Sequence, residues 1–130
     1  MSETRERLGR LLVAELGECC EDDVEARLDE LERLRAAATA PPTDRRALST
    51  LGDATRFRLA RALDAVGEPL CVCELGGVVD VSPSAVSHAL GDLADAGLAT
   101  PDRRGKWRYY EATERTSALL ATLGATREVA

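Results

Sequence analysis

The segment DVSPSAVSHALGDLADAG, residues 80–97, constrains the fold of this chain more tightly than any other stretch. Serine is a favoured N-cap residue, proline a favoured first helical residue, and glycine a common residue just past a helix end. Ser82, Pro83 and Gly97 occur in that order, so they predict one well-bounded helix. Its apolar residues repeat at helical spacing, which predicts a buried face made of Val86, Leu90 and Leu93.

The residues on either side of this helix predict a helix-turn-helix followed by a hairpin. We expect a short helix from about Val72 to Val79 and a tight turn that contains Val81. After Gly97, LAT (98–100) and KWRYYEA (106–112) have the composition of strands, and PDRRG between them predicts a hairpin connection. A short helix, a turn, a capped helix and a basic hairpin together match the DNA-docking unit of winged-helix proteins.

The remaining segments indicate a mainly α-helical chain. Amphipathic periodicity and helix-ending residues predict further helices over residues 3–17, 24–38, 44–51, 54–66 and 114–125. The paired prolines of TAPPTD (39–44) predict a linker. We therefore expect an N-terminal helical arm over 1–40 and a winged helix-turn-helix domain over 44–125. Leucine stripes near both termini predict additional dimerisation helices.

The formal net charge of −6 arises entirely in the N-terminal third of the chain. Residues 1–44 carry 6 Arg against 12 Asp and Glu, whereas residues 45–116 carry 10 basic and 10 acidic side chains. A neutral domain can still present a basic face. The net charge is therefore compatible with DNA binding.

Other features of the sequence restrict its location and chemistry. No apolar run approaches the ~20 residues of a membrane span, and the charged N-terminus lacks the apolar region of a signal peptide. We therefore expect a cytoplasmic protein with reduced thiols and no membrane partner. We do not expect an enzyme, because the sequence has no base–nucleophile arrangement, phosphate-binding loop or open metal triad.

Two sets of side chains are candidates for DNA contact. The first is the outer face of the helix that starts at Pro83, where small or hydrogen-bonding side chains can approach base edges: Ser84, Ala85, Ser87 and His88. The second is the basic hairpin tip, which suits phosphates or the minor groove: Arg103, Arg104 and Lys106. Either set alone would fit an ordinary surface, but their adjacency favours DNA binding. We expect Trp107 or Tyr109 to pack in the core.

The four cysteines form two close pairs, Cys19–Cys20 and Cys71–Cys73, with spacings that suit disulfides poorly. Reduced thiols are soft ligands that select zinc, cadmium, lead, copper(I), arsenic(III) and antimony(III). Placement of Cys71 and Cys73 at a helix N-terminus predicts a lowered thiol pKa. Each pair would also fit as small apolar filler in a core.

The central part of the chain, about residues 48–113, resembles the ArsR/SmtB family of metalloregulatory repressors, most of all its arsenic-responsive members. The matching stretches are LSTLGDATRFRLARAL, PLCVCELGGVVDVSPSAVSHALGDLADAGLA and RRGKWRYYEAT. The resemblance implies a homodimer that binds an operator in double-stranded DNA and leaves it when a metal or metalloid ion binds. It also implies that Cys71 and Cys73 are ligands, joined here by the N-terminal Cys19 and Cys20.

Arsenite or antimonite is the inducer that we expect for this thiol set. Trivalent arsenic takes three thiolates in a pyramid, and the two cysteine pairs can supply three within one subunit or across a dimer. A cadmium, lead or zinc response is an alternative, as is a thiol redox sensor. A thiol metal-binding interaction domain without DNA binding is a further alternative outside this class. A site of several histidines on the C-terminal helix is not expected, because no histidine follows His88.

Overall fold

The chain forms two compact units, Met1–Ala40 and Pro41–Ala130, in a computed structural model that describes residues 2–17 and 21–129. Within those described residues, no helix is both long enough and apolar enough to cross a membrane. The second unit holds the sheet and most of the buried side chains.

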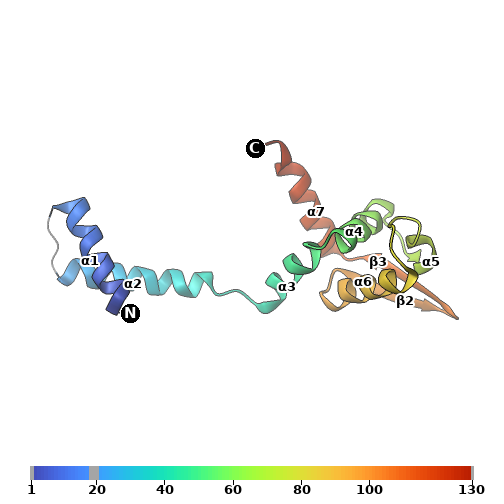
Figure 1. Cartoon of the computed structure of the whole chain (residues 1–130), viewed down its shortest axis with the longest axis horizontal. Helices are drawn as coiled ribbons and strands as arrows, with labels where there is room; N and C mark the ends of the chain where they lie inside the picture. Colours follow the sequence, from blue (N-terminus) through green and yellow to red (C-terminus); the bar gives the residue numbers. More distant parts are fainter. Residues whose placement is uncertain (1, 18–20, 130) are drawn as a thin grey trace. The chain divides into compact units, whose positions relative to one another are not determined.

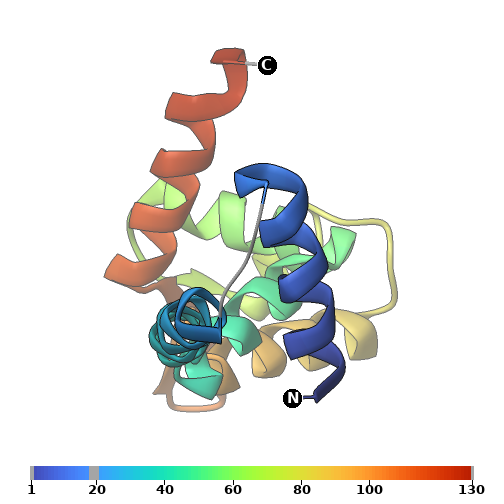
Figure 2. The ribbon, with the colours of Figure 1, turned by 90° about the vertical axis from the view of Figure 1, so that its left-hand side faces the viewer.

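The first unit is a pair of helices, α1 (Ser2–Leu16) and α2 (Glu21–Ala38), which cross obliquely (Figures 1 and 2). Val24 and Leu28 of α2 are buried where the two helices pack. α2 begins three residues before the predicted helix, because the acidic side chains at 21–23 interact favourably with the positive end of the helix dipole. The dimerisation and ligand roles of this arm stay predictions.

The second unit is a winged helix-turn-helix, and the prediction of a mainly α fold of this class is confirmed. Its helices are α3 (Pro42–Leu51), α4 (Ala54–Val66), α5 (Val72–Leu75), α6 (Pro83–Asp95), α7 (Glu114–Thr126) and the 3-10 helix η1 (Arg127–Val129). Its strands are β1 (Leu70–Cys71), β2 (Ala99–Arg104) and β3 (Trp107–Ala112). The strands form one antiparallel sheet in the order β1–β3–β2.

Ser82 and Gly97 bound α6 as predicted. The Ser82 hydroxyl accepts a hydrogen bond from the Ala85 backbone N–H at 3.1 Å, so Ser82 caps α6. Gly97 follows the end of α6 with φ +74°, a conformation that favours glycine. Asp53 caps α4 in the same way as Ser82 caps α6, by accepting from the Arg56 N–H at 3.0 Å.

The core of the second unit lies where α4, α6 and the sheet pack together. The predicted face of α6 is fully inside it. The largest buried side chains are Leu59, Leu63, Leu75, Val86, Leu90, Leu93, Leu98 and Tyr110. α6, the helix predicted to read DNA, is therefore fixed on its inner side by close apolar packing.

The hairpin differs from its prediction in the length of its first strand. The connection expected over residues 101–105 is mostly strand, and pairing continues until Arg104 lies opposite Trp107. The turn is Gly105–Lys106, with Gly105 at φ +62°, because a two-residue hairpin turn needs left-handed backbone. The basic side chains therefore stand on a regular ladder and not on a loose loop.

Three further boundaries differ from the predictions. β1 was not predicted, because two residues are too short to show strand periodicity. α5 ends at Leu75, four residues before the predicted end, because Gly76 and Gly77 follow it. α3 begins at Pro42, which occupies the first helical turn where proline is tolerated, so the linker is shorter than expected.

α7 is anchored at its start and less covered toward its end. The buried Thr116 hydroxyl donates to the Leu98 carbonyl at 2.6 Å. Leu119 packs against the core, whereas Leu123 is 48% exposed. Figure 2 shows the red end of α7 projecting beyond the rest of the second unit.

Candidate nucleic-acid interface and thiol pair

The outer face of α6 presents the four side chains predicted for base contact. Ser84 and His88 are exposed, and Ala85 and Ser87 are half-buried. The opposite face of the helix is fixed in the core, and its start is held by the Ser82 cap. This arrangement gives a rigid helix with small polar groups near its N-terminus, which suits insertion into a major groove.

The β2–β3 hairpin distributes its cations over two faces, because successive residues of a strand alternate. Arg103 and Arg108 are cross-strand partners on the same face as the buried Tyr110. Arg104 is on the other face, opposite Trp107. The predicted basic tip is therefore two distinct surfaces.

Cations on the outer face and at the turn of the hairpin already interact with other side chains of the hairpin. Arg104 donates to the Asp102 carboxylate at 3.0 Å and lies 4.4 Å above the centroid of the Tyr109 ring. Lys106, on the turn, lies 5.5 Å from the centroid of the Trp107 ring. All of the predicted cations, Arg103, Arg104 and Lys106, are exposed, but Arg104 is already partly neutralised by its acidic neighbour.

Arg108 belongs to this interface although it was not among the predicted contacts. Its guanidinium donates to the Tyr110 hydroxyl at 2.9 Å, and its side chain lines a hollow together with Ser84, Ser87 and His88 of α6. Its position depends on which strand face is buried: Tyr110, two residues away on β3, is in the core, and Arg108 shares its face toward α6. The sequence alone did not show which face that would be.

The aromatic residue in the core is also not the one expected. Trp107 is 49% exposed and Tyr109 is half-buried, whereas Tyr110 is 2% exposed. The prediction assigned the wrong face of the strand to the core. Pairing with β1 fixes that face, because Tyr110 lies opposite Leu70 in the centre of the sheet.

The second predicted site begins at the start of α5. The Cys71 Sγ accepts a hydrogen bond from the Cys73 N–H at 3.3 Å, and the Glu74 carboxylate accepts one from the Cys71 N–H at 3.0 Å. Cys71 is buried and Cys73 is exposed. Cys71 thus acts as the N-cap of α5 while its sulfur stays close to the neighbouring thiol.

The expected lowering of the Cys73 pKa is wrong. The hydrogen bond with Cys71, local desolvation and the negative charges of Cys71 and Glu74 together raise the pKa of the Cys73 thiol above its ordinary value. α5 is a single turn, and its dipole is too short to outweigh a second thiol and a carboxylate at that distance. These neighbours therefore disfavour the thiolate form of Cys73.

The other two predicted ligands, Cys19 and Cys20, lie outside the described residues. Within the part of the chain that the structure describes, no cluster of three or more His, Cys, Asp or Glu side chains could hold a metal ion. Cys71 and Cys73 alone supply two thiols, one fewer than a trivalent arsenic centre requires.

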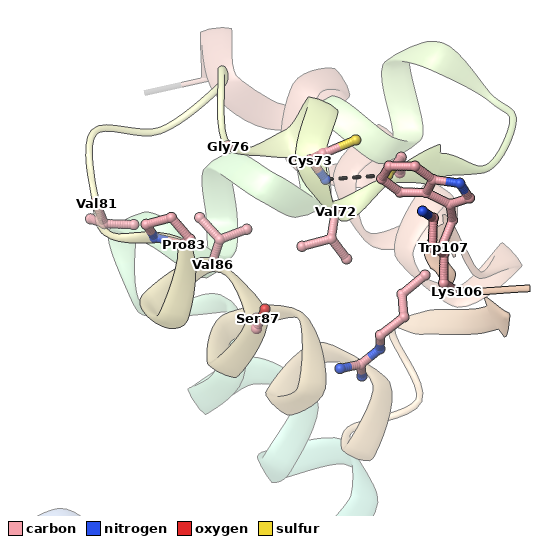
Figure 3. Close-up of a pocket in the computed structure, with 11 residues that line it drawn as sticks. Val72, Cys73, Gly76, Val81, Pro83, Val86, Ser87, Lys106 and Trp107 are labelled. Carbon is pink, nitrogen blue, oxygen red and sulfur yellow. Dashed lines mark hydrogen bonds between the residues drawn. The ribbon is translucent and has the colours of Figure 1, made fainter.

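A cavity of about 530 Å³ lies beside the thiol pair, between α5, the start of α6 and the hairpin. Figure 3 shows Val72 pointing into the space above α6, with Trp107 and Lys106 on the hairpin side. The Cys73 sulfur points away from α6 in this view. Residues of α5, α6 and the hairpin all line this cavity, so it lies between the thiol pair and the two elements predicted to contact DNA.

Comparison with known proteins places these features in a family context. Residues 53–100 match the family described as "Bacterial regulatory protein, arsR family". Over 129 residues the chain is 49% identical to a Halobacterium salinarum protein whose name describes a repressor, ArsR, of an arsenical resistance operon; the match covers 98% of this chain and 99% of that protein.

Two solved structures are similar to the second unit. One is a protein described as a possible transcriptional regulator for arsenical resistance, with a TM-score of 0.52 and 32% identity over 62% of this chain and 81% of that one. The other is the AntR antimony-specific transcriptional repressor, with a TM-score of 0.53 and 33% identity over 61% of this chain and 70% of that one.

Proposed function

Because the chain belongs to the ArsR family of bacterial regulatory proteins, we propose that it is a cytoplasmic, homodimeric repressor of an arsenical resistance operon. Each protomer places α6 in a major groove of operator DNA, and the hairpin contacts the adjacent backbone. Arsenite or antimonite binds cysteine thiolates and releases the dimer from the DNA. The family and its relatives are regulators, and the protein is not an enzyme.

The observation that carries the DNA-binding proposal is the convergence of α6 and the hairpin at Arg108. One guanidinium lies beside both the polar face of α6 and the Arg103 face of the hairpin. A helix face with small polar groups reads bases, and arginines beside it bind phosphates. The two predicted sets, residues 84–88 and residues 103–106, would thus form one continuous footprint.

Dimerisation follows from the geometry of operator binding. The reading helices of a dimer must lie about one DNA turn, ~34 Å, apart to engage two half-sites. The exposed apolar side chains of the terminal helices are available for a subunit interface: Leu11, Val13 and Leu16 of α1 and Leu123 of α7. The arm over 1–40 would then serve dimerisation and ligand binding, and the domain over 44–125 would bind DNA.

The inducer site combines the α5 thiols with the N-terminal pair. Arsenous acid condenses with three thiols, so three arsenic–sulfur bonds replace three arsenic–hydroxyl bonds and three water molecules leave. Cys19 and Cys20 supply two of these thiols, and Cys71 or Cys73 supplies the third, from the same or the partner subunit. The names of the relatives, which refer to arsenical resistance and to antimony, support this choice of ion.

Release follows by linkage between the two sites. A bound ion ties the N-terminal arm to α5, and α5 packs directly against α6. If the ion favours a spacing of the two reading helices that does not match the half-sites, the affinity for DNA falls. Bound DNA weakens ion binding by the same coupling free energy.

An electrophoretic shift experiment tests the proposal. A duplex from the region upstream of the protein's own gene is bound by the protein, and arsenite, antimonite, cadmium, lead and zinc are then titrated separately. We expect arsenite and antimonite to release the DNA at the lowest concentrations. Release by cadmium or lead alone would assign a divalent-ion sensor, release by an oxidant alone would assign a redox sensor, and no shift at all would leave a thiol metal-binding domain.

A further inference from the structure

The hollow between α6 and Arg108, which belongs to the proposed DNA footprint, also contains Gly91, and the proposed function does not by itself explain a glycine there. The hollow has a volume of about 450 Å³ and opens to solvent between α6 and β3. It is separate from the cavity beside Cys73, although Ser87 and Arg108 line both. Gly91 of α6 is one of its lining residues and contributes no side chain to it.

Nothing within the described chain requires glycine at this position. Glycine is the least favourable residue after proline in a helix interior, and Gly91 lies well inside the 13-residue α6. Its backbone is not in the left-handed region, unlike that of Gly97 just beyond the helix. A Cβ built on Gly91 would meet no atom within 4 Å. Neither backbone conformation nor internal packing accounts for the missing side chain.

The surroundings of Gly91 indicate what could approach it. His88 and Ser87 stand one helical turn away, and Arg108 reaches the hollow from β3. Asp92 and Asp95 line it as well, and Asp92 forms an ion pair with Arg56 at 3.5 Å.

The carboxylates of Asp92 and Asp95 indicate whether base edges or the sugar–phosphate backbone would lie in the hollow. They would repel a phosphate, but a carboxylate accepts a hydrogen bond from the cytosine amino group in the major groove. Base edges therefore fit the part of the hollow lined by Asp92 and Asp95 better than the sugar–phosphate backbone does, whereas Arg108 keeps the phosphate contact proposed above.

We propose that Gly91 lets the backbone of α6 approach the base edges of the major groove more closely than any residue with a Cβ would allow. Gly91 is thus a positioning residue for sequence-specific DNA recognition, and it is kept despite its cost to the helix. This inference rests on the proposed DNA-binding function. It goes beyond that function because it predicts that replacing Gly91 by Ala raises the stability of the protein and lowers its affinity for a specific DNA sequence.

The test is the substitution Gly91→Ala in the full-length protein. The probe is a duplex that the wild-type protein selects from a randomised pool, and a scrambled duplex of the same length and composition reports non-specific binding. We expect the melting temperature to rise by about 2 to 8 °C, because alanine favours the helix. We expect affinity for the selected duplex to fall at least tenfold while affinity for the scrambled duplex changes less than twofold.

Gly124→Ala is the matched control, because Gly124 is also inside a helix and its Cβ would also meet no atom within 4 Å. Its melting temperature should rise similarly with both affinities unchanged. Unchanged affinity of Gly91→Ala for both duplexes would overturn the inference. An equal loss of affinity for both duplexes would also overturn it and would assign the hollow to the DNA backbone instead. If the wild-type protein selects no sequence, the proposed function itself fails.

Discussion

At the scale of single residues, the cations of the hairpin are not equivalent. Arg104 already has a carboxylate partner and an aromatic ring beneath it, whereas Arg103 and Arg108 share the face that continues into α6. A cation that lacks an acidic partner releases more counterions when it meets a phosphate. The contribution that each of these side chains makes to DNA affinity is therefore expected to depend on its position in the hairpin as well as on its charge.

The first residue-scale prediction concerns salt dependence. Replacing Arg103 or Arg108 by Ala should weaken binding to all sequences and reduce the slope of log affinity against log salt by roughly 1 each. Arg104→Ala should reduce it by less, since Asp102 already compensates its charge. Fluorescence anisotropy over a salt series measures these slopes. Arg115→Ala, on α7, serves as the control, and equal slopes for all variants and wild type would remove the hairpin from the footprint.

The second residue-scale prediction uses the raised pKa of Cys73. A protonated thiol must lose its proton to bind cadmium, so cadmium affinity should rise as pH increases through neutrality, by up to about tenfold per pH unit for each thiol. The hydroxyl groups of arsenous acid take up the thiol protons and leave as water, so arsenite binding releases no net proton. Isothermal titration calorimetry between pH 6.5 and 8 should show that cadmium affinity rises steeply with pH, whereas arsenite affinity does not change. A steep arsenite slope would contradict the condensation described above.

At the scale of elements, α6 depends on two contributions that can be separated. Its inner face is held by the core, and its first turn is held by the Ser82 cap at 3.1 Å. Its outer serines take no part in either. Stability and DNA contact therefore reside on different sides of the same helix.

Substitutions at two serines should show this separation. Ser82→Ala should lower the free energy of unfolding by about 1 kcal/mol, because the Ala85 N–H loses its acceptor at the helix start. Ser84→Ala, two residues later and exposed, should leave stability within about 0.5 kcal/mol of wild type and reduce operator affinity. Urea unfolding and anisotropy measure the two quantities. Equal stability losses would show that Ser84 also supports the helix.

At the scale of the whole molecule, the proposed function requires the two units to communicate. The thiols at 71 and 73 belong to the second unit, and the cysteines at 19 and 20 belong to the first. An ion held by both pairs would make the position of the arm depend on inducer. The arm also carries the acidic excess of the chain, and it is a different unit from the one that holds α6 and the hairpin.

The prediction at this scale is that the N-terminal thiols serve induction and not DNA binding. Replacing Cys19 and Cys20 together by Ser should leave operator affinity within about twofold of wild type and abolish release by arsenite. Thermal unfolding of the variant checks that the fold is unchanged. Normal arsenite release by this variant would exclude the arm from the inducer site and leave the ion to α5 alone.

Sequence by itself determined the elements whose information is local. Helix caps at Ser82 and Asp53, the glycine after α6 and the periodic leucines act over a few residues, so the order of helices and the winged fold could be predicted from them. The residues of the outer face of α6 were found for the same reason, because a buried stripe fixes the opposite side of a helix.

Tertiary structure decided what depends on pairing between distant segments. The two-residue β1 fixes which face of β3 is buried, and thereby selects Tyr110 for the core and places Arg108 beside α6. The raised pKa of Cys73 is different, because Cys71, Cys73 and Glu74 are neighbours in the sequence and their opposition to the helix terminus is a local effect. Cross-strand register is a property of the assembled structure, so no local pattern in the sequence could reveal it.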